Sequence, residues 1–271
     1  MFPSTFEYVR ATSVAEAVSI LAGDEDAKLL AGGHSLLPLM KLRLAAPSTL
    51  IDIGRISELS FIEDRGDFVA IGALTRHRDL ETSAVLAASV PILAHVASLV
   101  GDPAVRHRGT IGGSVAHGDG ASDLPAAILA LDATIVAQGV GGERTIAAVD
   151  FFKGFLETDL RPGEVLTEIR VPKVHGGWSY QKFNRRAQDW AIVGVAAVTN
   201  GSTRISLVNM GSTPLRATAS EGAINSGASI ADAAALAAEG LDPPSDLNAS
   251  ADYRRHLATV LVRRALEEAT A

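Results

Sequence analysis

The sequence predicts an α+β protein made of two domains, with the boundary near Pro172. The 271 residues, 47% of them hydrophobic, are enough for two domains with a buried core. Before Pro172, short apolar strands alternate with helices that carry capping signals. After Pro172, the pattern changes to paired strands joined by an Asn200-Gly201 hairpin turn, and then to alanine-rich segments. We therefore divide the chain into residues 1–172 and 173–271.

The first elements follow from capping and turn signals. Ser13-Val-Ala-Glu16 is a capping box, and Gly23 follows, so we expect a helix over 14–22. Segment 80–100 is predicted to be mostly helical, with Pro91 starting a second helix because proline is tolerated in a first turn. Short strands are expected in three apolar runs, at 27–31, 48–53 and 68–74.

The remaining elements are predicted in the same way. A helix is expected to begin at Ser122 or Asp123, with Pro125 in its first turn. A long amphipathic helix closes the chain within 245–270, after two alanine-rich segments at 217–226 and 229–239. Strands are expected at 134–138 and 144–152 around a glycine turn, at 164–172, at 179–186, and in both arms of 190–211.

Composition excludes several classes of function. The net charge of −7 argues against a nucleic-acid-binding protein, which would show a basic surface. No apolar run reaches the roughly 18 residues of a transmembrane segment, and the N-terminus does not resemble a secretory signal, so we expect a cytoplasmic protein. The absence of cysteine excludes thiolate catalysis and cysteine-bound clusters in this chain, and no His-x-x-x-His pair indicates a metal site.

Two glycine-rich segments have the same pattern. "LLAGGHSLLPLM" (29–40) and "RHRGTIGGSVAHGDGASD" (106–123) each place a glycine pair before a small hydroxyl residue. Paired glycines let the backbone approach a ligand, and free N–H groups at the start of a helix bind anions. Neither segment matches G-x-G-x-x-G or a P-loop, and each by itself could be an ordinary tight turn. Two such loops that converge would suit the pyrophosphate of a dinucleotide.

The two loops carry a family resemblance. "KLLAGGHSLLPLMKLRLAAPSTLIDI" and "RHRGTIGGSVAHGDGASDLPAAILALDA" resemble the signature segments of the FAD-binding medium subunits of molybdenum hydroxylases, the carbon monoxide dehydrogenase and xanthine dehydrogenase family. Three further segments fit the same family in the same order: "FEYVRATSVAEAVSILA", "EVLTEIRVP" and "YQKFNRRAQDWAIVGVAA". Family members often have alanine or proline at the positions of Gly118 and Gly120, which leaves the detailed shape of the second loop open.

The resemblance implies a fold and a cofactor site. The fold would be an FAD-binding domain of two α+β subdomains, of the vanillyl-alcohol-oxidase-like kind, followed by an α+β domain with an antiparallel sheet. The pyrophosphate of FAD would lie between the two loops, held mainly by backbone donors. The residues implied on one side are Ala31, Gly32, Gly33, His34, Ser35 and Leu36, and on the other side Thr110, Ile111, Gly112, Gly113 and Ser114.

Further site residues are implied one by one. Asp123 would accept hydrogen bonds from hydroxyl groups of the flavin nucleotide, or cap a helix. The Leu166 backbone would lie along the cofactor, or this residue would simply be a core residue. Lys182 would lie near the flavin ring and stabilise the anionic reduced flavin, or be a surface lysine. Trp190 would stack on the isoalloxazine or pack between the domains. Val100 and Gly101 would line the adenine end of the site.

The resemblance also implies the role of the chain in a larger enzyme. By this resemblance, the chain itself supplies no catalytic residue and binds no metal, and its FAD performs the redox chemistry. A large subunit would carry the molybdenum cofactor and a small subunit two [2Fe–2S] clusters, in a heterotrimer that is itself doubled. The apolar part of 31–47 would face the small subunit. Two alternatives are a stand-alone FAD-dependent oxidase or reductase and a nucleotide-binding scaffold without redox function.

Overall fold

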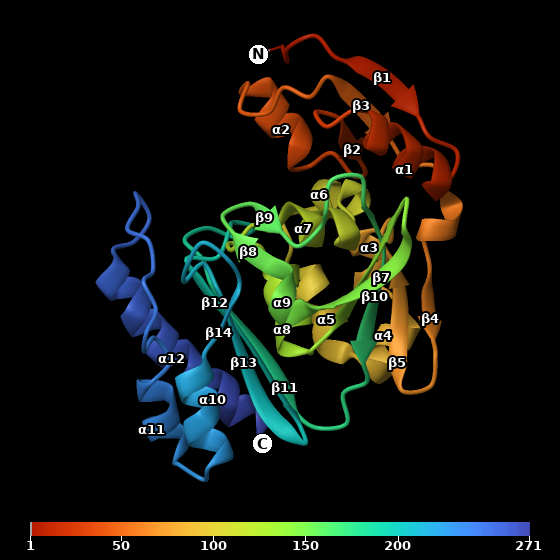
Figure 1. Ribbon diagram of the computed structural model, residues 1–271. Helices are drawn as coiled ribbons and strands as arrows, with labels where there is room; N and C mark the ends of the chain where they lie inside the picture. Colours follow the sequence, from red (N-terminus) through yellow and green to blue (C-terminus); the bar gives the residue numbers. More distant parts are fainter. Residues whose placement is uncertain (1) are drawn as a thin grey trace.

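The structure is a computed structural model that describes residues 2–271, and it has three parts (Figure 1). The N-terminal subdomain is a parallel three-stranded sheet in the order β1-β3-β2, with helix α1 beside it. Helix α1 begins where Ser13 Oγ accepts a hydrogen bond from the Glu16 N–H at 3.1 Å, and it buries Val14, Ala17 and Val18 on one face. The elements are β1 (Glu7–Arg10), α1 (Val14–Gly23), β2 (Lys28–Leu30), α2 (Leu36–Lys41) and β3 (Thr49–Asp52).

The middle subdomain is a five-stranded antiparallel sheet in the order β4-β5-β10-β6-β7, covered by short helices. Helix α1 of the N-terminal subdomain contacts β10 and β6 of this sheet, which joins the two subdomains. The strands are β4 (Ile62–Asp64), β5 (Phe68–Gly72), β6 (Thr134–Gly139), β7 (Gly142–Ala147), β10 (Val165–Pro172) and the small pair β8 (Phe152–Gly154) and β9 (Glu157–Thr158). The helices are α3 (His77–Glu81), α4 (Ala84–Ser89), α5 (Pro91–Ser98), α6 (Pro103–Arg108), α7 (Ile111–His117), α8 (Asp123–Ala130) and α9 (Ala148–Phe151).

The C-terminal part is an antiparallel sheet in the order β11-β12-β13-β14. Strand β12 is buried on both faces, because alternate side chains enter different cores: Ala196 packs with the middle subdomain, and Val195 packs with the terminal helices. The elements are β11 (Trp178–Phe183), β12 (Val193–Asn200), β13 (Ser202–Val208), β14 (Leu215–Arg216), α10 (Thr218–Asn225), α11 (Ile230–Ala235) and α12 (Ala251–Ala269). None of the helices within residues 2–271 is both long and apolar enough to cross a membrane.

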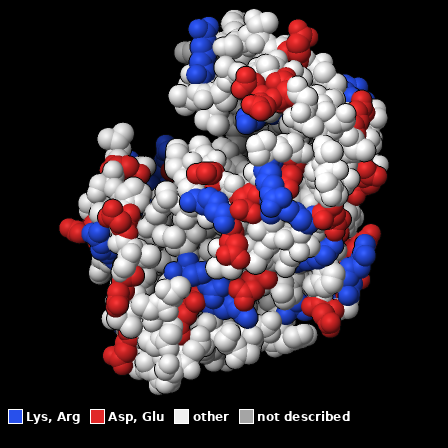
Figure 2. Space-filling view, viewed as in Figure 1, with Lys and Arg blue, Asp and Glu red and all other residues white. Residues whose placement is uncertain are grey.

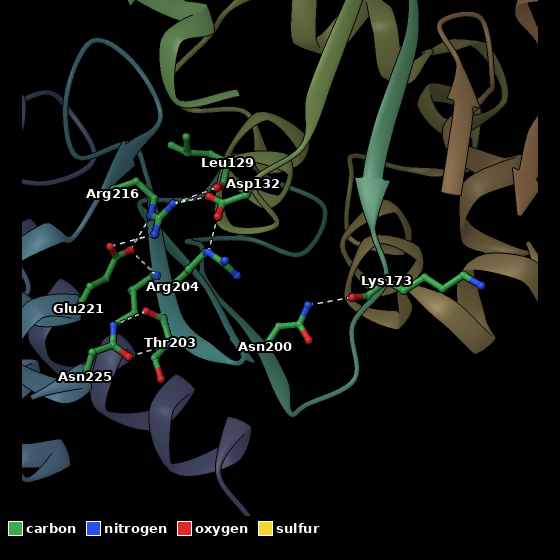
Figure 3. Close-up of polar contacts among 10 residues, drawn as sticks. Leu129, Asp132, Lys173, Asn200, Thr203, Arg204, Arg216, Glu221 and Asn225 are labelled. Atoms are coloured by element: carbon green, nitrogen blue, oxygen red, sulfur yellow. Dashed lines mark hydrogen bonds and ion pairs between the residues drawn. The ribbon is translucent and has the colours of Figure 1, made fainter. Parts of the chain in front are cut away.

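A polar network joins the C-terminal sheet to the middle subdomain (Figure 3). Asp132, two residues after the end of α8, pairs with Arg204 of β13 and with Arg216 of β14, the latter at 2.8 Å. Arg216 in turn pairs with Glu221 of α10 at 2.5 Å. Because these groups are partly buried and connected, they fix the C-terminal sheet against the end of α8.

Most predicted elements are present, and two details differ. Strand β7 ends at Ala147; in the rest of the predicted strand 144–152, residues 148–151 form helix α9 and Phe152 begins β8. The expected loop over 106–123 contains the last turn of α6 and all of α7. Ser35 stands at the N-cap position of α2, but its side chain makes no capping hydrogen bond.

Candidate functional site

A large cavity lies where the three parts of the chain meet. Its volume is about 810 Å³, which lies in the upper part of the usual range of roughly 300–1,000 Å³ for ligand pockets. Figure 2 shows the surface hollowed below the N-terminal subdomain, toward the C-terminal part. The walls come from β2 and the loop after it, from α6 and α7, from the segment between β9 and β10, and from the loop after β11. The cavity therefore has room for a dinucleotide.

The two glycine loops converge on this cavity, as their sequences predicted. A Cβ atom built on Gly32 would lie 2.3 Å from the carbonyl oxygen of Arg108, so only glycine allows the first loop to touch the second. Gly33 has a φ of +80°, a conformation that favours glycine, and a Cβ there would lie 2.9 Å from Leu37 Cδ1. The glycines of the first loop are thus required by close contact and by backbone conformation.

The first loop has free hydrogen-bond donors. Within residues 2–271, none of the backbone N–H groups from Gly32 to Ser35 donates to a protein acceptor. The same residues line the cavity. Unpaired N–H groups beside a cavity of this size are suited to bind the oxygens of a phosphate.

The second loop is different, and for Ile111 to Ser114 the prediction of free backbone donors was wrong. The N–H groups of Ile111 and Gly112 donate to the carbonyls of Thr75 and Ala73, at 3.0 and 2.9 Å. Those of Gly113 and Ser114 donate to the side chain and the carbonyl of Thr110. The second loop is therefore bonded to the end of β5 and to its own cap, and its glycines serve close packing: a Cβ on Gly112 would lie 2.5 Å from Ala73 Cβ.

A buried polar cluster forms one end of the cavity. Asp123, only 7% exposed, accepts hydrogen bonds from Tyr180 at 2.5 Å and from Lys182 Nζ at 2.8 Å. Lys182 also donates to the Leu99 carbonyl at 2.9 Å. Burial raises the pKa of Asp123, against the opposing effect of the Lys182 charge and the two hydrogen bonds. Burial and the nearby Asp123 carboxyl also raise the pKa of Tyr180, which keeps its hydroxyl group protonated as a donor.

The structure brings most of the predicted residues to the cavity. Lys182 is not a surface lysine, because its side chain is buried. Its Nζ donates to the Leu99 carbonyl, next to Val100, so Lys182 and Val100 lie at the same end of the cavity. They therefore cannot bind the flavin ring and the adenine at opposite ends of one FAD molecule, as the resemblance implied. Trp190 lines the cavity and is 58% exposed, so it is not packed between domains. Leu166 lies beside a bulge in β10. Ile111 is the exception: it is fully buried in the core and does not line the cavity.

Sequence reasoning missed several residues of the site. His77, at the start of α3, lines the cavity and is 4% exposed. Tyr180 organises Asp123 from within the core. The segment between β9 and β10 adds Arg161 and Glu164 to the wall. None of these carried a local signal, because each reaches the site only through the packing of distant elements.

Known families and proteins match the chain along its whole length. Residues 4–174 match the family described as "FAD binding domain in molybdopterin dehydrogenase", and residues 178–269 match the "CO dehydrogenase flavoprotein C-terminal domain". The carbon monoxide dehydrogenase medium chain of Hydrogenophaga pseudoflava is 45% identical, over 100% of this chain and 99% of that protein. A subunit of the 6-hydroxypseudooxynicotine dehydrogenase complex of Paenarthrobacter nicotinovorans is 40% identical, over 99% and 96%.

Solved structures show the same fold. Carbon monoxide dehydrogenase from H. pseudoflava matches with a TM-score of 0.95 at 46% identity, covering 99% of this chain and 98% of that one. Quinoline 2-oxidoreductase from Pseudomonas putida 86 matches with a TM-score of 0.94 at 36% identity, covering 99% and 98%. The fold and the cavity therefore define an FAD-binding protein of the molybdopterin dehydrogenase type. The chain belongs to the family of FAD-carrying medium subunits of molybdenum hydroxylases.

Proposed function

We propose that this chain holds FAD in the cavity between its two glycine loops and transfers electrons within a molybdenum hydroxylase. It would receive electrons from [2Fe–2S] clusters of a small subunit and pass them to an external acceptor. The observation that carries this proposal is the contact of the two loops at Gly32, beside a cavity lined by free N–H groups. Bound FAD supplies the redox chemistry, because a flavin can accept single electrons and deliver pairs.

The residues of the chain divide the binding between them. The N–H groups of the first loop bind phosphate oxygens, and the second loop supplies a rigid wall that small residues keep close to the ligand. Asp123, held by Tyr180, accepts hydrogen bonds from ligand hydroxyl groups, and Lys182 provides a fixed positive charge. Trp190, which lines the cavity, offers its exposed indole as a stacking surface.

The proposed complex is a heterotrimer with a molybdenum-cofactor large subunit and a [2Fe–2S] small subunit, present twice. The small subunit would dock near α2, where the chain leaves a group of leucines exposed directly after the first loop. The exposed fractions are 38% for Leu37, 61% for Leu42 and 72% for Leu44. An apolar group of this kind beside a redox site suits a partner that brings its own cofactor close.

The test is to purify the protein, record its visible spectrum, and identify by chromatography the compound that heat releases. We expect FAD in near-equal amount to protein, and an Lys182→Ala variant should lose most of it. If heat releases no FAD from the protein purified with its partner subunits, and none after incubation with added FAD and removal of the excess, the proposal is refuted. Unchanged flavin content in both Lys182→Ala and Gly113→Trp would refute the assignment of the site.

A further inference from the structure

His77 is a buried side chain at the cavity that the residues of the protein leave without a polar partner. It is 4% exposed, and its Nδ1 atom has no hydrogen-bond partner within residues 2–271. A buried polar atom without a partner is unfavourable, because it has given up its hydrogen bonds to water. Such a group in the wall of a ligand cavity calls for an explanation.

The ring of His77 has a defined direction. Its backbone N–H donates to the Gly109 carbonyl at 3.0 Å, which ties the start of α3 to the second loop. A Cβ atom on Gly109 would lie 2.6 Å from both Cδ2 and Nε2 of His77, so this edge of the ring lies against Gly109. Nδ1 is fully enclosed, whereas His77 and Gly109 both line the cavity. The ring therefore reaches the cavity with its Nε2 edge, beside Gly109.

The protonation state follows from the surroundings. Burial, with a smaller effect of the neighbouring His34, Arg76 and Arg106, lowers the pKa of His77 to about 4. The ring is therefore neutral at pH 7 and carries one proton. An N–H at the enclosed Nδ1 would be a buried donor without an acceptor, so the proton is placed on Nε2.

This donor stands where one is needed. The second loop approaches the ligand site, but the N–H groups of Ile111 to Ser114 are already bonded within the protein. A neighbouring side chain with a free N–H can replace them. On this basis, and given the proposed FAD site, we propose that His77 is a cofactor-binding residue whose Nε2–H donates to a pyrophosphate oxygen of FAD beside the second loop.

The test compares two variants of the full-length protein, purified as it assembles with its partners, stripped of FAD and titrated with FAD by calorimetry. Glutamine places an amide nitrogen near the position of Nε2, whereas leucine fills the same space without a donor. We expect His77→Leu to weaken FAD binding at least tenfold and His77→Gln to stay within about threefold of the unchanged protein. Riboflavin, which lacks the pyrophosphate, should bind all three equally.

The comparison of FAD with riboflavin provides a readout that separates a pyrophosphate contact from a purely structural role, because a structural defect at His77 would weaken both ligands. The inference is overturned if the unchanged protein binds FAD and His77→Leu binds it equally well, or if His77→Leu weakens riboflavin to the same extent. Failure of the unchanged protein to bind FAD would instead refute the proposed function.

Discussion

The hydrogen bond from Tyr180 to Asp123 can be tested against a matched pair elsewhere in the chain. Tyr180 donates to Asp123 at 2.5 Å in a fully buried setting, and Tyr8 donates to Asp52 at 2.6 Å on the surface, where Tyr8 is 49% exposed. The chemistry is the same in both pairs, and burial is the difference. Substitution of each tyrosine by phenylalanine removes one hydroxyl and leaves the ring.

The two substitutions should lower the free energy of unfolding by different amounts, because only the Tyr180–Asp123 pair is buried. A hydrogen bond to a buried charged group contributes about 1.5–3 kcal/mol, so Tyr180→Phe should lower the free energy of unfolding by about 2 kcal/mol. That corresponds to roughly 4–8 °C in melting temperature for a chain near this size. Tyr8→Phe should change the free energy of unfolding by less than about 0.5 kcal/mol, because water replaces the exposed hydroxyl.

The pH dependence adds a second criterion. Burial raises the pKa of Asp123, which means that the folded protein disfavours the ionised carboxylate. The ionised form is therefore the one that the hydrogen bond from Tyr180 stabilises most. The stability difference between the unchanged protein and Tyr180→Phe should therefore be largest at neutral pH and shrink as falling pH protonates Asp123. Denaturant unfolding of both variants at several pH values measures this. Equal costs for the two variants at pH 7, or a Tyr180 cost that does not change with pH, would refute the reasoning.

Three further outcomes follow from the structure. Gly32→Ala should reduce flavin content at least tenfold, because its Cβ would meet the Arg108 carbonyl at 2.3 Å, whereas Gly222→Ala, in open space within α10, should keep the flavin and be slightly more stable. The depressed pKa of His77 should make stability fall by about 3 kcal/mol as the pH drops from about 6.5 toward 4, and this loss should be absent in His77→Gln. Hydrogen exchange across 36–47 should be slower in the complex than in the isolated chain, and equal exchange would remove α2 from the interface with the small subunit.

Local signals in the sequence were sufficient for most of the fold. Ser13 caps α1, and Pro91 is the first residue of α5, as predicted. These signals act within a few residues, so they can be recognised without knowledge of the tertiary structure. The sequence did not predict α7, because a glycine pair disfavours a helix by its intrinsic propensity. Helix α7 forms because Gly112 packs on Ala73 and its N–H bonds to that residue.

The two glycine loops show why the same sequence pattern can have two different roles. Both have a glycine pair followed by a small hydroxyl residue, and both line the cavity. In the first loop the N–H groups have no protein acceptor, whereas in the second loop the end of β5 supplies acceptors at Ala73 and Thr75. An N–H that holds a loop in place is not free to bind a phosphate. The segment from Ile111 to Ser114 is therefore a rigid wall whose N–H groups are already used. The donor that we propose on that side, the side chain of His77, is one that the glycine pattern does not reveal.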